Sequence, residues 1–330
     1  MKVALLGSKD FDSLEFHLND SLKFLGNEIF HIDLKDVVNV PYRFNYWGFK
    51  LIQKYDQFIF KKIAYKIIEQ TPDLVICTYR FIHPICIDII KRNLPNVSVI
   101  HINPDAITTF EQQQIFASKY DAYFSKDSFI VDFMKNKLGL NTFYLPESFN
   151  PRIHKMPLQD RKKLEDETKI DVVTFGTMYP YRAKMVSHLV QNGINMTLFG
   201  TPDKKFPRPE IVTNFRNEYI TGSRKSEVLF GSKIVFNNFH YAEINSVNAK
   251  FFEIAGIGGF QICDYKPAIC EYSFIPVEKF TYNDINEGVE LINYYLKNEK
   301  ERHQLALDQY IHFVKNHTYE HRINTILNCL

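Results

Sequence analysis

Short apolar runs alternate with amphipathic, helix-length segments along most of this chain, and that alternation limits its possible folds more than any other feature. The apolar run KVALLGS (2–8) precedes a segment with leucines at helical spacing, and a second apolar run, EIFHIDL, follows. A strand, a helix and a strand in this order predict two parallel strands joined by a crossover helix.

The alternation occurs twice, and a polar, charge-rich segment separates the two occurrences. Further strands are predicted at 73–79, 97–103, 121–127 and 141–148, and in the second occurrence at 170–177, 194–200 and 232–239. A chain of 330 residues is long enough for two domains of about 150 residues. We therefore predict an α/β protein with two Rossmann-like domains, 1–150 and 170–330, joined by a linker at 151–169. Ligands of such folds bind at the carboxyl ends of strands, so we expect the site in the cleft between the domains.

The composition excludes several classes of protein. A net charge of +2 argues against a strongly basic nucleic-acid binder, so we expect no nucleic-acid partner. No run reaches the roughly 18 apolar residues of a membrane span. The five cysteines are scattered and lack a Cys-x-x-Cys pair, which fits reduced thiols and a cytoplasmic location. The histidines form no metal-binding pattern and Asp10-Phe11-Asp12 is interpreted as helix capping, so we expect neither a metal nor another cofactor.

The stretch NSVNAKFFEIAGIGGFQICDY (245–265) follows a predicted strand and contains one carboxylate, Glu253, between bulky apolar residues. We expect a helix to begin near Ser246 and to include Asn248 in its start. The amides of its first turn would attract an anion such as phosphate, and Lys250 adds a positive charge. Glu253 could accept hydrogen bonds from the vicinal hydroxyls of a ribose. The alternative is a packing helix that ends at glycines and leaves Glu253 solvated.

The stretch FGTMYPYRAKMVSHL (175–189) combines a predicted strand end at Gly176 with a helix start that carries Arg182 and Lys184. Backbone amides and two cations at one strand end suit a diphosphate. The next predicted strand ends at Gly200, which we expect at the same edge. The alternative is a solvated, basic helix start. Cations at the N-terminal end of a helix interact unfavourably with its dipole, which slightly favours the binding site over this alternative.

In the first half, HINPDAITTF (101–110) follows a predicted strand. His101 or Asp105 could orient an acceptor, and Asp105 could take its hydroxyl proton as a general base if the reaction inverts. If the reaction retains, no dedicated base is required and both residues would position the acceptor. The alternatives are a strand-end histidine and a turn aspartate. Gly7 and Ser8, after the first strand, are also expected at the acceptor side, where they could instead form a simple turn.

Residues 42–68 combine six lysine or arginine residues, Arg43 among them, with many aromatic residues and the chain's one tryptophan, Trp47. A basic aromatic helix can lie on an anionic membrane surface, where a lipid-linked acceptor would be found. The alternative, which we favour at this point, is an ordinary surface helix with one stripe facing the core.

Three blocks carry a resemblance to a known family: VTFGTMYPYRAKMVSHLVQNGINMTLFG, GSKIVFNNFHYAEINSVNAKFFEIAGIGGFQICDY and NHTYEHR. In order and spacing they resemble the spore-maturation-protein-like (CgeB-like) branch of the GT-B glycosyltransferases. The resemblance covers most of residues 70–325 and is weaker before them. It implies a GT-B fold, a nucleotide-sugar donor held mainly by the second domain, and an acceptor held by the first.

The resemblance also implies roles for single residues. Related retaining enzymes carry a Glu-x7-Glu motif, whose second Glu matches Glu253 as the ribose ligand, whereas its first position is Asn245 here. Lys250 stands where the CgeB-like pattern often has Arg. The implied activity is retaining transfer of a sugar to a glycan or lipid-linked acceptor in bacterial surface polysaccharide synthesis. The alternatives are a nucleotide-sugar epimerase of the same fold and a non-catalytic nucleotide- or sugar-binding coat protein, the latter favoured only by Asn245.

Overall fold

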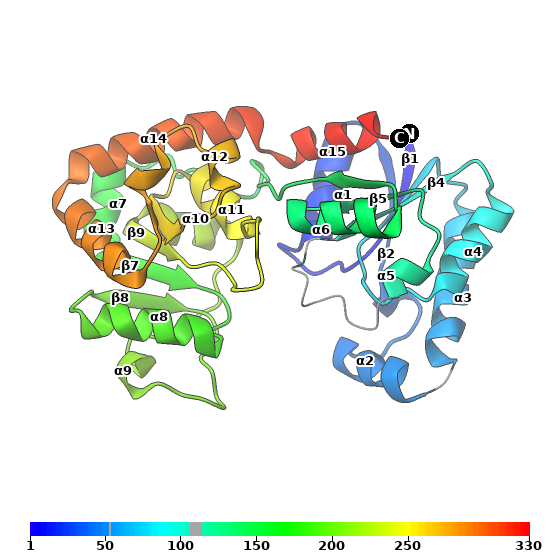
Figure 1. The fold of residues 1–330 in the computed structure, drawn as a ribbon, viewed down its shortest axis with the longest axis horizontal. Helices are drawn as coiled ribbons and strands as arrows, with labels where there is room; N and C mark the ends of the chain where they lie inside the picture. The colour runs from blue at the N-terminus through cyan, green and yellow to red at the C-terminus, as the bar shows by residue number, and fades with distance from the viewer. Residues whose placement is uncertain (53, 104, 106–113) are drawn as a thin grey trace. The chain divides into compact units, whose positions relative to one another are not determined.

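The computed structural model describes residues 1–52, 54–103, 105 and 114–330, which form two compact units (Figure 1). The first unit comprises Met1–Pro146 together with Tyr319–Leu330, and the second comprises Glu147–Thr318. This division differs from the predicted boundaries in two places. The last helix belongs to the first unit, and the segment predicted as a linker, 151–169, belongs to the second.

The first unit is built on a six-stranded parallel sheet with the order β2-β1-β3-β4-β5-β6. Its elements are β1 (Lys2–Leu6), α1 (Leu14–Phe24), β2 (Glu28–Ile32), η1 (Leu34–Asp36), α2 (Tyr42–Leu51), α3 (Tyr55–Glu69), β3 (Leu74–Cys77), α4 (Pro84–Asn93), β4 (Ser98–Asn103), α5 (Gln114–Ala117), β5 (Ala122–Ser125), α6 (Ser128–Asp132), η4 (Phe133–Lys137), β6 (Thr142–Tyr144) and α15 (Tyr319–Asn328). The strands predicted from the apolar runs are all present.

Both faces of this sheet are buried at its inner strands, which explains why β3 is apolar at every position and β1 at all but its first residue. Successive residues of a strand point to opposite faces. Ala4 and Leu6 accordingly pack in a core with α3 and α4, whereas Val3 and Leu5 pack in a second core with α1 and α15. The C-terminal helix α15 therefore supplies part of the first unit's core, which is a long-range pairing that local patterning does not reveal.

The second unit is built on a five-stranded parallel sheet with the order β11-β10-β9-β7-β8. Its elements are α7 (Arg161–Thr168), β7 (Ile170–Phe175), α8 (Pro180–Gln191), β8 (Met196–Phe199), α9 (Pro209–Val212), α10 (Gly222–Phe230), β9 (Ser232–Asn237), α11 (Ala249–Ile257), β10 (Gln261–Asp264), α12 (Ile269–Tyr272), η5 (Val277–Lys279), β11 (Thr281–Tyr282), α13 (Ile285–Lys297) and α14 (Glu299–Asn316). Helices α7, α10 and α11 form one packed group, and α8 packs against α13.

The strand order places a topological switch point in the second sheet. The chain passes from β7 to β8 on one side of it, and the next strand, β9, pairs with the other side of β7. In open parallel sheets, ligands bind outside the carboxyl ends of the strands at such a point. The carboxyl ends of β7 and β9 are thus where the fold favours a binding site.

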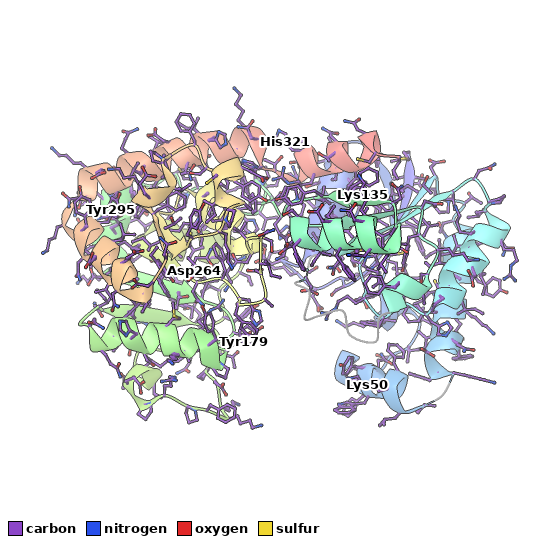
Figure 2. All side chains as sticks on the ribbon, in the orientation of Figure 1. Lys50, Lys135, Tyr179, Asp264, Tyr295 and His321 are labelled. Carbon is purple, nitrogen blue, oxygen red and sulfur yellow. The ribbon has the colours of Figure 1, made fainter. Side chains whose placement is uncertain are left out.

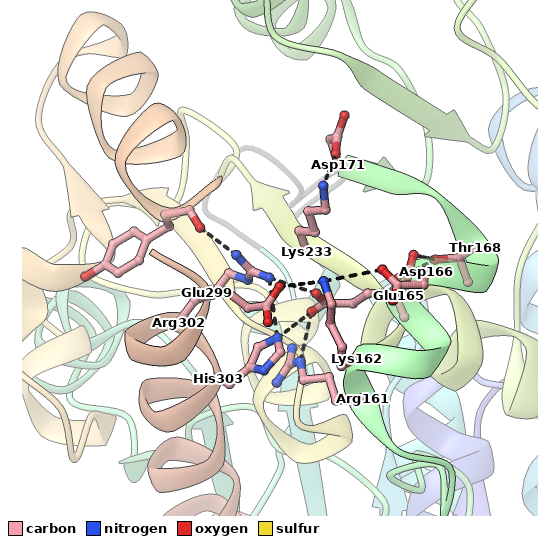
Figure 3. A network of polar contacts seen from close by, with 12 residues as sticks. Arg161, Lys162, Glu165, Asp166, Thr168, Asp171, Lys233, Glu299, Arg302 and His303 are labelled. Atoms are coloured by element: carbon pink, nitrogen blue, oxygen red, sulfur yellow. Dashed lines mark hydrogen bonds and ion pairs between the residues drawn. The ribbon is translucent and has the colours of Figure 1, made fainter. Parts of the chain in front are cut away.

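Helix α7, in the segment predicted as a linker, is fixed by a buried ionic network (Figure 3). The carboxylate of Glu165 accepts hydrogen bonds from Arg302 Nη2 at 2.8 Å and from Arg161 Nε at 3.2 Å, and His303 Nε2 lies 2.9 Å from it. Arg161 also donates to the carbonyl of Gly258, the C-cap of α11, at 2.8 Å. The network therefore joins α7 to α14 and to the end of α11. No helix in the described part of the chain is long and apolar enough to cross a membrane.

Candidate functional site

The carboxyl end of β7 forms the floor of the candidate site. Gly176 follows β7 with φ +97°, and Gly200 follows β8 with φ +115°, a region that favours glycine. A side chain on Gly200 would overlap the backbone of Gly176, so the two turns approach each other closely. A Cβ on Gly176 would lie 2.6 Å from Lys250 Nζ and 3.6 Å from Arg182 Nη1. The two cations therefore converge over a glycine backbone.

Arg182 lies in the first turn of α8 and is buried, with 8% of its surface exposed. Its Nη1 donates to the carbonyl of Thr177 at 2.9 Å, and its Nε donates to Asn238 Oδ1 at 3.0 Å. Burial lowers the pKa of Arg182, but a guanidinium keeps its charge in proteins. These bonds hold a full positive charge at the ends of β7 and β9.

Lys250 reaches the same place from the first turn of α11. Its Nζ donates to the carbonyl of Phe175 and lies 4.5 Å from the centre of the Phe175 ring. Burial lowers the pKa of Lys250 well below its ordinary value, and the charges of Arg182 and Lys225 lower it further. In the described part of the chain, neither Arg182 nor Lys250 forms a salt bridge with a carboxylate. An anion at this point would relieve the repulsion between the two cations.

Aromatic residues at the ends of β7 and β9 pack against one another. Tyr179 precedes α8 and is half exposed (Figure 2), and its ring lies edge-on to His240 with centroids 6.0 Å apart. The ring of His240 lies 4.2 Å from that of Tyr241, which in turn lies 6.0 Å from that of Tyr181. The loops after β7 and β9 are thereby packed together beside Arg182.

The amide of Asn248 is the N-cap of α11. Its Oδ1 accepts from the backbone N–H of Phe251 at 3.1 Å, and its side chain exchanges two hydrogen bonds with that of Asn237, at 3.0 and 3.2 Å. The helix thus begins at Ala249 rather than near Ser246, because the asparagine supplies the cap. These hydrogen bonds fix the start of α11, which carries Lys250, to the end of β9.

Glu253 is buried, which excludes the solvated carboxylate considered from the sequence. Its Oε2 accepts from Lys225 Nζ at 3.1 Å, and its Oε1 lies 3.9 Å from His154 Nε2. Lys225 is on α10, and His154 lies in the segment predicted as a linker. Sequence reasoning assigned no function to Lys225, His154 or Asn238, because their partners lie far away along the chain.

Three further residues were predicted at the donor site: Lys184, Ser246 and Asn245. Lys184 is exposed and does not join Arg182, because helix positions two apart point about 200° from each other. The prediction that both cations line one site is therefore wrong for Lys184. Ser246 is fully buried and Asn245 half-buried, in the loop between β9 and α11.

In the first unit, Gly7 and Ser8, which were predicted for the acceptor side, follow β1 directly. A side chain on Gly7 would overlap Thr78 and Glu15, so the turn after β1 is tightly packed. Ser8 lines a cavity of about 250 Å³ together with Asp33 and Tyr79. The hydroxyl of Tyr79 donates to Asp33 Oδ1 at 2.9 Å.

His101 and Asp105 differ in their exposure. His101 is 1% exposed, its Nε2 lies 3.3 Å from the carbonyl of Tyr79, and burial lowers its pKa to about 4. Its predicted place at the cleft edge is therefore wrong, since the ring packs in the core beside Tyr120. Asp105 is part-exposed and pairs with Arg80 Nη1 at 3.0 Å. The rest of its loop, residues 104 and 106–113, lies outside the described residues.

Residues 42–68 include α2 and most of α3; several apolar side chains are buried on α3, whereas others are exposed on α2. Ile59 and Ile63 of α3 are in the core, as the surface-helix alternative predicts. On α2, by contrast, Phe44 is 64% exposed, Trp47 51% and Leu51 75%, so an apolar surface faces water. Lys50 of α2 projects beside it (Figure 2). The side chain of Arg43 and residue 53 lie outside the described residues.

Comparisons with known proteins concern the fold and the second half of the chain. Residues 182–328 match the protein family described as glycosyl transferase-like. No curated protein matches the chain in sequence. Among solved structures, the chain is similar to sucrose-phosphate synthase from Thermosynechococcus elongatus, with 12% identity, a TM-score of 0.69, and coverage of 99% of this chain and 97% of that one. The chain has the GT-B fold.

Two further GT-B structures are similar over the full length. HepE of Anabaena, solved in complex with UDP-glucose, has 13% identity and a TM-score of 0.65, and each chain is covered completely, at 100%. The lipopolysaccharide outer core galactosyltransferase WaaB has 13% identity and a TM-score of 0.59, with 100% of this chain and 99% of that one covered. The predicted fold class is confirmed.

Proposed function

We propose that this GT-B protein is a glycosyltransferase that moves a sugar from a nucleotide-diphosphate sugar to a hydroxyl acceptor. The observation that carries the proposal is the convergence of Arg182 and Lys250 over Gly176, at the switch point of the second sheet. Both cations lack a carboxylate partner in the described part of the chain, and each belongs to the first turn of a helix. The similarity of residues 182–328 to the glycosyl transferase-like family supports the same assignment.

In this mechanism, the chain's own cations stabilise the leaving nucleoside diphosphate. Negative charge develops on the bridging phosphate oxygen as the sugar departs, and fixed donors are most effective where that charge appears. Arg182 and Lys250 would contact the diphosphate, and Glu253 the ribose. We propose that no metal is required, because the two cations supply the charge that a divalent ion would otherwise provide. We further propose retention at the anomeric carbon, with Asn245 beside the donor sugar.

For the acceptor, we propose a glycan or lipid-linked hydroxyl compound used in bacterial surface polysaccharide synthesis by a cytoplasmic enzyme of the CgeB-like branch. WaaB, a lipopolysaccharide outer core galactosyltransferase, is an enzyme of similar fold that supports this proposal. The cavity beside Ser8 and the part-exposed Asp105 would lie on the acceptor side. The exposed apolar residues of α2, together with Lys50, suit peripheral contact with an anionic membrane. Flotation with vesicles of phosphatidylglycerol, against vesicles of phosphatidylcholine, tests that contact, and Trp47→Ser should weaken it.

A thermal-shift panel of UDP, GDP and ADP, with their sugar derivatives, tests the donor assignment. At least one nucleotide should raise the melting temperature, and Arg182→Gln should abolish the rise. Lys184→Gln is the matched control, because Lys184 is on the same helix but exposed. Absence of any shift at millimolar nucleotide would contradict the proposal.

Product analysis then separates transfer from the alternatives. Release of nucleotide that depends on an added acceptor indicates a transferase. Conversion of one nucleotide sugar into its epimer without an acceptor indicates an epimerase, and binding without turnover of any donor indicates a non-catalytic protein.

A further inference from the structure

The outer face of helix α14 carries a stripe of exposed apolar side chains. Leu307, Ile311 and Val314 are 44%, 58% and 38% exposed. Their spacing of four and then three residues places them on one side of the helix, as in the seam of a coiled coil. α14 lies at the edge of the second unit and packs against α11 and α13 (Figure 1). Four residues on its other side are buried: Arg302, Ala306, Gln309 and Phe313.

Charges of both signs stand beside this stripe. Asp308 and Lys315 are seven residues apart, so they lie on the same flank of the helix, next to Ile311. Neither forms a salt bridge with a described residue, and Asp308 accepts one hydrogen bond, from Gln304 Nε2 at 2.8 Å. In the heptad that has Ile311 at position a and Val314 at position d, both charges occupy position e. Charges at e positions set the choice and the orientation of a partner helix.

We infer that α14 pairs with α14 of a second copy of this chain, in antiparallel orientation around a two-fold axis. An interface of this symmetry must be complementary to itself. With the axis between Ile311 and Val314, each of these residues packs against the other one in the second copy. Asp308 of each copy then lies beside Lys315 of the other, which gives two ion pairs. A parallel pairing would put equal charges at the same level and could not form them. The inference goes beyond the proposed function and does not depend on it.

The other exposed apolar surface, on α2, does not suit a second copy of itself. The sequence of α2, YRFNYWGFKL, contains Arg43 and Lys50 but no acidic residue. Two copies of α2 that faced each other would bring positive charges together, which is unfavourable. The stripe on α14 has one acidic and one basic neighbour, so the same pairing is favourable there.

Sedimentation velocity over a concentration series of the full chain tests the pairing. A single helix pair is a small interface, so the dimer fraction of the wild type should rise with concentration. Ile311→Glu should raise the dissociation constant at least about tenfold, because it places unpaired carboxylates in the seam. Ile311 is exposed, so the melting temperature of the monomer should change little. Trp47→Ser, on α2, is the control and should keep the wild-type dissociation constant.

Exchange of the two charges tests the antiparallel orientation. Asp308→Lys and Lys315→Asp each turn both ion pairs into like-charge pairs, so each should raise the dissociation constant at least about tenfold. The double variant Asp308→Lys/Lys315→Asp should restore it. An equal mixture of the two single variants should form a heterodimer, because each supplies the charge that the other lacks. Asp132→Lys and Lys135→Asp, exposed residues with the same charge changes, are the controls and should dimerise as the wild type does, mixed or alone.

Each failure has a definite meaning. A wild type that stays monomeric up to the highest soluble concentration would overturn the inference. So would a dimer that Ile311→Glu leaves intact, because its interface would lie elsewhere. If neither the double variant nor the mixture restores dimerisation, the antiparallel pairing of α14 is wrong.

Discussion

Two groups of cations in the second unit have opposite surroundings. In the network between α7 and α14, Arg161 and Arg302 both donate to the carboxylate of Glu165, whose side chain is fully buried (Figure 3). At the end of β7, Arg182 and Lys250 donate to backbone carbonyls instead and have no carboxylate partner among the described residues. The cations of the first group share a carboxylate, whereas those of the second form no salt bridge among the described residues.

The pKa values follow the same contrast. Burial raises the pKa of Glu165, but the hydrogen bond from His303 and the charge of Arg302 outweigh it, and the net pKa lies below its ordinary value. For Lys250, burial and the neighbouring cations act together and lower the pKa far below its ordinary value. An anionic ligand beside Lys250 would favour the charged amine and raise this pKa. Under the proposed function, the first group would serve stability and the second would serve binding of the diphosphate.

The largest expected effect is on stability in the first group. Glu165→Gln should lower the free energy of unfolding by about 3–5 kcal/mol, because Arg302 would stay buried without its counter-charge. Urea denaturation measures this value, and Arg182→Gln is the comparison. Arg182→Gln should cost about 1 kcal/mol, since it leaves no carboxylate unpaired and removes repulsion with Lys250. Equal losses of unfolding free energy in Glu165→Gln and Arg182→Gln would contradict the difference proposed between the two groups of cations.

The next effect is on binding in the second group. Arg182→Gln should weaken binding of the preferred nucleoside diphosphate by about 10- to 100-fold, as expected for lost charge-assisted hydrogen bonds. Calorimetry measures the change. A variant of the first group that stays folded, such as Lys162→Gln on the surface of α7, should bind as the wild type does. An unchanged affinity in Arg182→Gln would show that the phosphate lies elsewhere.

A smaller effect is expected at the glycine under the cations. Gly176→Ala combines a φ of +97° with a Cβ only 2.6 Å from Lys250 Nζ. We expect a loss of about 1–3 kcal/mol in unfolding free energy, together with weaker nucleotide binding as Lys250 is displaced. Gly193→Ala, also at positive φ but with open space around it, is the control for backbone strain alone. Equal effects of Gly176→Ala and Gly193→Ala on nucleotide binding would contradict the close approach of Lys250 to the backbone of Gly176.

The smallest effect is the pH dependence of Lys250. Its folded-state pKa is lowered, so between that pKa and the ordinary lysine value the unfolded chain binds more protons, and unfolding free energy rises with pH. As the pH rises through that lowered pKa, Lys250 of the folded chain loses its charge, and diphosphate affinity should fall. Calorimetry at a series of pH values up to the ordinary lysine pKa of about 10.4 should show this fall in the wild type. Lys250→Arg should not show it, because a guanidinium keeps its charge, and a fall that persists in this variant would assign the effect to another group.

Much of the fold could be predicted because buried parallel strands are apolar and end at glycines or polar turns. The same logic located Gly176, Arg182 and Lys250, each beside a strand end or a helix start. It failed for Lys184, although helical geometry alone separates that residue from Arg182. Nor could local patterns reveal partners far apart in the chain, such as Lys225 for Glu253, or Arg302 for Glu165 in the segment interpreted as a linker.

A crystal structure with a bound nucleoside diphosphate would test the central claim most directly. Crystals soaked with UDP, GDP and ADP should show the diphosphate over Gly176, within hydrogen-bonding distance of Arg182 and Lys250. A nucleotide bound elsewhere in the second unit, with both cations still turned to the carbonyls of Phe175 and Thr177, would contradict it.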